Sequence, residues 1–184
     1  MRKLAVIFPG IGYTCDKPLL FYAEKLAIKS GYEIKRIAYS LPGDRKIRGD
    51  KKKIEEAFRF LYTCTEDSLS DTDLSQYDEI LFISKSIGTA IASAYAEKYK
   101  ENTVRHVLYT PLEATFGFRP QNAISFLGTK DPWSVPEDVI RLAKEAGVPM
   151  HVYENANHSL ETGDVLKDID ILKDVMEKTE RFIG

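Results

Sequence analysis

Short continuous apolar runs alternate along this chain with segments whose apolar residues recur at helical spacing. Runs of this length, bounded by glycine, proline or polar residues, are typical of strands buried on both faces of a parallel sheet. The intervening segments have one apolar and one charged face, as surface helices do. Strands are predicted at residues 3–8, 32–39, 80–83, 103–110, 122–127 and 148–153. Helices are predicted at residues 18–30, 51–65, 87–98, 136–146 and 164–182.

Two connecting segments show no helical pattern. Residues 67–78 are acidic with few apolar positions, and residues 111–121 lack a helical repeat although they contain Phe116 and Phe118. Both are predicted to be loops. Strands that alternate with helices predict an α/β fold, with a mostly parallel six-stranded sheet, right-handed crossovers and helices on both faces. One three-layer sandwich accounts for residues 1–184 as a single domain.

Composition narrows the classes of partner. The chain has 184 residues, of which 43% are hydrophobic and 29% charged, and its net charge is −2. Because there is no broad basic field, nucleic acid is not an expected partner. No stretch approaches the ~20 apolar residues that span a membrane, and the five apolar residues before Pro9 are too few for a signal peptide. Cys15 and Cys64 lack metal-ligand spacing and are expected to be reduced, so we expect a cytoplasmic protein.

A strand-to-helix turn within residues 79–98 carries the strongest candidate chemistry. The apolar run 80–83 leads into residues 84–88, Ser-Lys-Ser-Ile-Gly, after which helical spacing begins. Small residues two positions before and after Ser86 allow a sharp turn close to neighbouring backbone. This is the pattern of the G-x-S-x-G nucleophile elbow, which lifts a serine hydroxyl above the carboxyl ends of a sheet. Ser84 replaces the first glycine, and the alternative is an ordinary helix N-cap at Ser86.

Two further polar residues follow strands at the same edge of the predicted sheet. Asp131 comes after the strand 122–127, and His158 comes after the strand 148–153. A serine nucleophile needs a base within hydrogen-bond reach, and the base needs an acceptor that fixes its tautomer. Since parallel strands bind ligands beyond their carboxyl ends, we expect Ser86, His158 and Asp131 to converge as nucleophile, base and acid.

The order serine, acid, histidine along the chain is that of the α/β-hydrolases, and the sequence resembles this family over nearly its whole length. The resemblance implies a minimal, lidless member. Strand 3–8 leads directly into the oxyanion turn, so the two antiparallel strands that commonly precede it are absent. The cap of larger members is reduced to about residues 111–121. Such a site should be open and suited to small or flexible acyl substrates.

Alternatives exist for the proposed acid and base. Glu113 follows the fourth predicted strand, the position from which some members of the family supply their acid, and is a rival to Asp131. Asp131 precedes a proline, so an Asx-turn is its structural alternative. His106 and His151 fall within predicted strands, where packing or surface roles are expected, and the alternative for His158 is a solvated loop residue.

The resemblance also implies an oxyanion hole made of two backbone N–H groups. One belongs to Ile87, after the serine, and the other to Ile11, in the turn after the first strand. Pro9 stands where many members carry a histidine that braces this turn. For Tyr13 and Trp133, the alternative is the packing role of an ordinary half-buried aromatic residue. The candidate substrate contacts are Gly10, Gly12, Tyr13 and Trp133.

These features predict a serine hydrolase that cleaves a small ester or thioester through an acyl-enzyme, with a small-molecule acyl substrate as partner and no metal or organic cofactor. Its activity should rise with pH through the imidazole pKa, ~6.5 if unperturbed. The same residues would also serve a peptidase or a dienelactone or C–C hydrolase. A non-catalytic binding scaffold is the alternative outside enzymes. A nucleotide-binding loop is disfavoured because Cys15 occupies the third glycine position of G-x-G-x-x-G. The sequence leaves the oligomeric state open.

Overall fold

The computed structural model describes residues 1–39, 47–99 and 104–184. Within them, the strands form one six-stranded sheet in the order β2-β1-β3-β4-β5-β6, and each neighbouring pair is parallel. The strands are β1 (Lys3–Phe8), β2 (Glu33–Arg36), β3 (Glu79–Lys85), β4 (Arg105–Tyr109), β5 (Ala123–Gly128) and β6 (Met150–Tyr153). The predicted α/β class and parallel sheet are therefore confirmed. Residue 103 of the predicted fourth strand lies outside the described residues.

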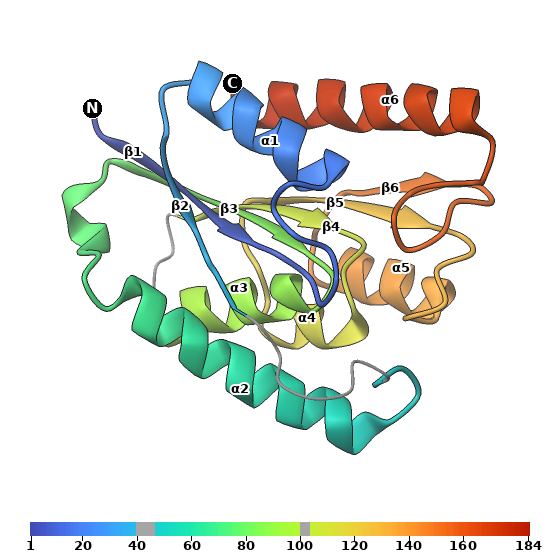
Figure 1. Cartoon of the computed structure of the whole chain (residues 1–184), viewed down its shortest axis with the longest axis horizontal. Coiled ribbons are helices and arrows are strands. Elements are labelled where there is room, and N and C mark those ends of the chain that lie inside the picture. The colour runs from blue at the N-terminus through green and yellow to red at the C-terminus, as the bar shows by residue number, and fades with distance from the viewer. Residues whose placement is uncertain (40–46, 100–103) are drawn as a thin grey trace.

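Helices cover both faces of the sheet (Figure 1). Two helices lie side by side on one face, and the other four cover the opposite face. The pair is α1 (Pro18–Lys29) and α6 (Val165–Ile183), and the other four are α2 (Lys51–Leu69), α3 (Ile87–Lys98), α4 (Glu113–Gly117) and α5 (Pro136–Glu145). Local sequence sets several of the helix starts. Pro18 occupies the first turn of α1, while the Asp50 and Asp164 carboxylates accept backbone N–H bonds at the starts of α2 and α6.

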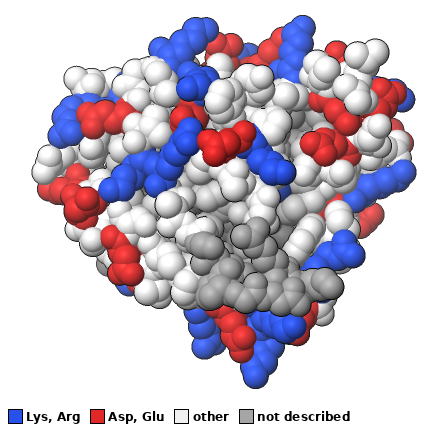
Figure 2. All heavy atoms as spheres, in the orientation of Figure 1, with Lys and Arg blue, Asp and Glu red and all other residues white. Residues whose placement is uncertain are grey.

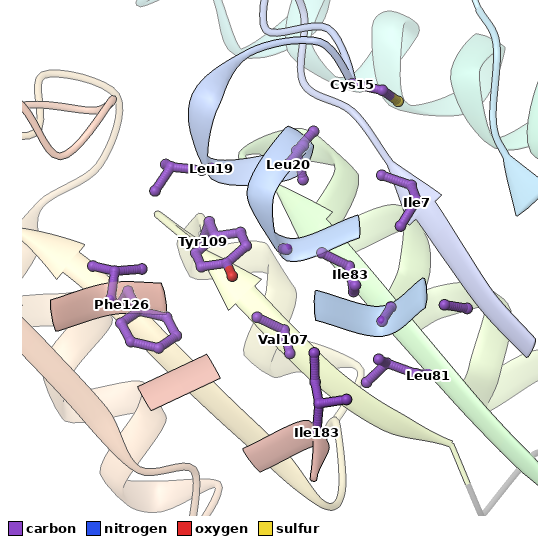
Figure 3. Close-up of a cluster of buried hydrophobic side chains, with 14 of the residues drawn as sticks. Ile7, Cys15, Leu19, Leu20, Leu81, Ile83, Val107, Tyr109, Phe126 and Ile183 are labelled. Carbon is purple, nitrogen blue, oxygen red and sulfur yellow. The ribbon is translucent and has the colours of Figure 1, made fainter. Parts of the chain in front are cut away.

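The continuous apolar runs are explained by burial on both faces of the sheet. Successive side chains of a strand point to opposite faces, so each strand needs apolar residues at every position. On β3, Leu81 and Ile83 face the layer of α1 and α6, where they pack in the cluster drawn in Figure 3. Ile80 and Phe82 face α2 and α3. By the same alternation, Lys85 at the end of β3 points toward the α1 and α6 layer.

Two segments predicted as loops contain helices. Within residues 67–78, α2 continues to Leu69 and a short 3₁₀-helix (Leu74–Gln76) follows. The Ser68 hydroxyl bonds to the carbonyl four residues earlier, and both Leu69 and Leu74 are buried, so the polar sequence is held helical by tertiary packing. Within residues 111–121, α4 forms because Thr115 and Phe116 are buried against α3 and α5. Single-sequence periodicity does not detect such short, packing-dependent helices.

The outer surface of the molecule carries charges of both signs. Figure 2 shows Lys and Arg interspersed with Asp and Glu on the face that it displays, with no single basic field. Across residues 1–39, 47–99 and 104–184, every helix is too short or too polar to cross a lipid bilayer.

Candidate active site

The site lies where the strand order reverses. The chain places β2 on one side of β1 and β3 on the other, so the turns that follow β1 and β3 are adjacent at the carboxyl edge of the sheet. Such a switch point is where open parallel sheets bind ligands. The loops after β5 and β6 reach the same edge, and the chemistry-bearing residues come from these four connections.

Ser86 occupies a strained turn between β3 and α3. Its φ of 57° and ψ of −129° are rare for a residue with a side chain, and its N–H donates to the Tyr109 carbonyl at 3.0 Å. Gly88 makes the turn possible, because a Cβ there would lie 2.6 Å from the carbonyl oxygens of Phe8 and Pro9. This geometry is that of a nucleophile elbow.

The departure from G-x-S-x-G at Ser84 is accommodated without an unpaired polar group. The Ser84 side chain is fully buried, and its hydroxyl donates to the Val107 carbonyl on β4 at 3.1 Å. The close contact at the elbow comes instead from Gly10, where a Cβ would lie 3.1 Å from the Cβ of Ser86. The turn after β1 therefore supplies a small residue beside the serine.

The structure brings Ser86, His158 and Asp131 together. His158 Nε2 lies 2.7 Å from Ser86 Oγ, and His158 Nδ1 lies 2.6 Å from Asp131 Oδ2. The backbone N–H of Trp133 donates to the other Asp131 oxygen at 2.9 Å. Because the Asp131 carboxylate accepts from Nδ1–H, the neutral imidazole leaves Nε2 free to accept the serine proton.

The environment of His158 favours the neutral imidazole. Burial lowers its pKa below 6.5, and the charge of Lys85 lowers it further, whereas the hydrogen bond to Asp131 opposes both effects. The indole ring of Trp133 lies 5.7 Å from the imidazole, centroid to centroid, and shields part of it from water. A base in this state is ready to accept a proton near neutral pH.

The rival acid and the other histidines have separate roles. Glu113 accepts the backbone N–H of Val135 at 2.7 Å. His106 is buried edge-on to the Phe82 ring, and burial lowers its pKa to about 4. His151 stacks on Phe126 at the sheet edge. In the part of the chain that the structure describes, no hydrogen bond joins Glu113 or either histidine to the serine or its two partners.

The two predicted oxyanion donors, Ile11 and Ile87, belong to the turns after β1 and β3. Ile87 is the first residue of α3, where N–H groups have no partner within the helix. Ile11 lies in a tight turn closed by reciprocal backbone bonds of 3.0 and 3.3 Å between Gly10 and Tyr13, with Gly12 at a φ of 75°. Both isoleucines line the cavity above the serine. Among the described residues, neither N–H donates to a backbone carbonyl.

The turn after β1, in which Pro9 stands, is braced by two tyrosines. The Tyr39 hydroxyl donates to the carbonyl of Pro9. On the other side of the turn, the Tyr13 hydroxyl accepts the backbone N–H of Leu19 at 3.1 Å, and burial raises the Tyr13 pKa to about 12. Tyr39 and Tyr13 therefore hold this turn, at which Pro9 replaces the histidine noted in the sequence analysis.

No protein-family model and no curated protein sequence matches this chain, but solved structures are similar to it. An α/β serine hydrolase homologue from Coxiella burnetii has a TM-score of 0.63 at 16% identity, over 100% of this chain and 85% of that one. A Xanthomonas campestris serine hydrolase without a lid has a TM-score of 0.61 at 12% identity, over 98% and 82%. The Pyrococcus furiosus esterase Pf2001 has a TM-score of 0.60 at 13% identity, over 100% and 84%. The chain has the α/β-hydrolase fold.

In this α/β-hydrolase fold, the cap expected after β4 is the five-residue helix α4 alone. A cavity of about 220 Å³ remains above Ser86. Trp133 and Leu112 contribute to its apolar wall, together with Ile47, which precedes α2, and Ile54, in the first turn of α2. Of the predicted substrate contacts, Gly12, Tyr13 and Trp133 line this cavity, whereas Gly10 lies against the serine. Ile47 and Ile54 reach the site only through tertiary packing, so the turn motifs of the sequence did not predict them.

A lysine that was not predicted also lies at this site. Lys85 immediately precedes the serine, lines the cavity and is 0% exposed. The sequence feature that indicates it is a charged residue that continues an apolar run buried on both faces.

The two thiols lie elsewhere. Cys15 is buried, and burial raises its pKa to about 11, whereas Cys64 is half-buried on α2.

Proposed function

We propose that this protein is a serine hydrolase that cleaves a small ester or thioester through an acyl-enzyme intermediate. The observation that carries the proposal is the pair of hydrogen bonds, 2.7 and 2.6 Å, that link Ser86 to His158 and His158 to Asp131. A strained turn that presents the serine at a sheet switch point supports it. A packing role would require neither the strain nor this order of partners.

In the acylation step, Ser86 Oγ attacks the carbonyl carbon of the substrate while its proton passes to His158 Nε2. The carbonyl π electrons move to oxygen, and the N–H groups of Ile11 and Ile87 donate to that oxyanion. Asp131 stabilises the imidazolium that has formed. When the tetrahedral intermediate collapses, the bond to the leaving group breaks and His158 returns the proton to the departing alcohol or thiol.

Deacylation repeats these steps with water. His158 Nε2 takes a proton from a water molecule, whose oxygen attacks the acyl carbon of the ester on Ser86. The intermediate collapses to the free carboxylic acid, and the proton returns to Ser86 Oγ. Because all proton transfers use one imidazole, no metal or organic cofactor enters the scheme.

The cavity supports a small, mainly apolar acyl group as substrate. Its volume of about 220 Å³ is below the usual range for drug-sized ligands, and its wall beside Trp133 is apolar. The name of the similar Pyrococcus furiosus protein, an esterase, agrees with acyl transfer. The choice between an oxygen ester and a thioester depends on the leaving group, which an assay with both kinds of substrate distinguishes.

Labelling with a fluorophosphonate tests the proposal directly. The probe is incubated with the wild-type protein, with Ser86→Ala and with Ser75→Ala, an exposed serine that precedes β3 at the opposite edge of the sheet. Intact and peptide mass spectrometry should find one adduct, on Ser86, in the wild type and in Ser75→Ala. Before incubation with the probe, the wild type and Ser75→Ala should hydrolyse a panel of short-chain esters and thioesters, and labelling of Ser86 should abolish this activity. A folded wild-type protein that is neither labelled nor active would favour a binding scaffold.

A further inference from the structure

Lys85 is a charged side chain buried without a partner. Its side chain is 0% exposed, and within the described residues its Nζ has no hydrogen-bond acceptor. Lysine is almost never fully buried unless it is paired, because removing an ammonium group from water is costly. A methionine or leucine would fill the same space without that cost. The amine therefore calls for an explanation other than packing.

The surroundings of Lys85 place its amine next to the machinery proposed above. Its Nζ lies 4.8 Å from the centroid of the Tyr13 ring, whose face attracts a cation. The Asp131 and Glu161 carboxylates act on it from the loops after β5 and β6. Tyr109 is its register partner on β4, but the Tyr109 hydroxyl is taken by Thr179.

Both oxygens of the Asp131 carboxylate already accept a hydrogen bond from a group other than the Lys85 amine. Asp131 Oδ2 accepts from His158, and Asp131 Oδ1 accepts from the N–H of Trp133. Asp131 therefore attracts two bases but hydrogen-bonds to only one of them. A proton on Lys85 and a proton on His158 compete for the same negative charge, so the two bases are coupled.

We propose that Lys85 is a positioning residue of this site, whose buried amine acts through the Asp131–His158 pair and keeps the imidazole in the neutral form that accepts the Ser86 proton. This inference rests on the proposed function for its catalytic meaning. Its electrostatic content, the coupling of two bases that line one cavity, does not depend on that function.

The direction of the coupling follows from charge. Burial lowers the pKa of Lys85 to about 7, so the amine is charged in the pH range where His158 gains its proton. A second positive charge in the same low-dielectric region opposes that protonation. Lys85 thus extends the range of the neutral imidazole toward acid pH. Without the amine, His158 would become protonated at a higher pH.

Two lysine-to-methionine substitutions isolate the effect. Lys85→Met removes the buried charge and keeps a side chain of similar length. Lys130→Met is the matched control, because it removes the same charge from the residue next to Asp131, but from a position exposed to water. For each protein, kcat/KM with p-nitrophenyl acetate is measured from pH 4.5 to 8. The His158 imidazole is titrated in parallel by NMR, with His158→Gln to assign its signal.

The expected result is an upward shift of both midpoints in Lys85→Met, larger than any shift in Lys130→Met. Coincident midpoints in the folded Lys85→Met, Lys130→Met and wild-type proteins would overturn the inference. If Lys85→Met does not fold, Lys85→Gln, which is neutral but keeps a polar end, replaces it and should show the same shift. Failure of the proposed function has a different signature: no hydrolysis and no Ser86 adduct in any protein, while the NMR titration still decides whether Lys85 and His158 are coupled.

Discussion

Gly88, at the start of α3, lies against the end of β1 so closely that a Cβ on it would come within 2.6 Å of the Phe8 carbonyl oxygen. The contact joins the elbow that carries Ser86 to the turn that carries the Ile11 N–H. Because the obstacle is backbone, a larger residue at position 88 cannot be accommodated by a side-chain rotation. The distance between the nucleophile and one proposed oxyanion donor therefore depends on this glycine.

Gly88→Ala should displace the elbow from β1. We expect a loss of roughly 1–3 kcal/mol in the free energy of unfolding, the scale of overpacking in a core, and a decrease in kcat. Denaturant unfolding and steady-state kinetics measure the two effects. Gly117→Ala, at the end of α4, is the control, since no atom lies within 4 Å of its added Cβ. Equal stabilities of the two variants would contradict the steric argument.

Asp131→Asn should disable the site, while Glu113→Gln should not. An asparagine at residue 131 cannot fix the Nδ1–H tautomer of His158, and changing a triad aspartate in this way lowers kcat by about three to four orders of magnitude. The Glu113 carboxylate instead accepts the N–H of Val135, a bond that a glutamine oxygen preserves. Steady-state kinetics on both variants separates the candidate acids, and the reverse ranking would make Glu113 the acid.

The hydrophobic pattern was sufficient to predict the fold and to predict that Ser86, Asp131 and His158 lie close together. Continuous apolar strands require a covered parallel sheet, and the carboxyl ends of parallel strands lie at one edge. The pattern failed for α4, since its five residues carry no period and owe their helix to burial of Thr115 and Phe116. The pattern also did not predict the proposed role of Lys85, because that role depends on the carboxylates of the loops after β5 and β6.

The pH dependence of kcat/KM should show an acid limb whose midpoint lies below pH 6.5. Burial and the Lys85 charge lower the pKa of His158, and only the neutral imidazole accepts the Ser86 proton. Activity therefore rises with pH as the imidazolium loses its proton, and the rise is nearly complete at neutral pH. A substrate without ionisable groups, assayed from pH 4.5 to 8, measures the limb. A midpoint above 6.5 would contradict the environment described for His158.

Ile54→Trp should shorten the acyl groups that the site accepts. Ile54 lines the cavity from the first turns of α2, and a larger ring there reduces the space beyond Ser86. We expect kcat/KM for longer acyl esters to fall roughly tenfold more than for acetate esters. Phe60→Trp, at an exposed position of the same helix, should leave the chain-length profile unchanged. Identical profiles for wild type and Ile54→Trp would place the acyl group elsewhere.

Lys85 should lower the stability of the folded protein at neutral pH. Burial lowers its pKa from 10.5 to about 7, so between these values the unfolded chain holds a proton that folding must release. The destabilisation is complete below about pH 7 and fades as pH rises toward 10.5.

Lys85→Met should therefore be more stable than wild type at pH 7, by an amount on the order of a few kcal/mol. The difference should narrow at pH 9, because the proton that the wild type releases on folding costs less free energy to release at higher pH. Urea unfolding at both pH values measures it, and subtracting the two proteins cancels the titration of the tyrosines. Lys130→Met should match the wild type at both pH values, because its amine is exposed. A stability difference that stays constant from pH 7 to pH 9 would show that the amine remains charged in the folded as well as in the unfolded protein. A gain in stability that accompanies an upward shift of the acid limb would mean that the buried amine is kept for catalysis at the expense of stability.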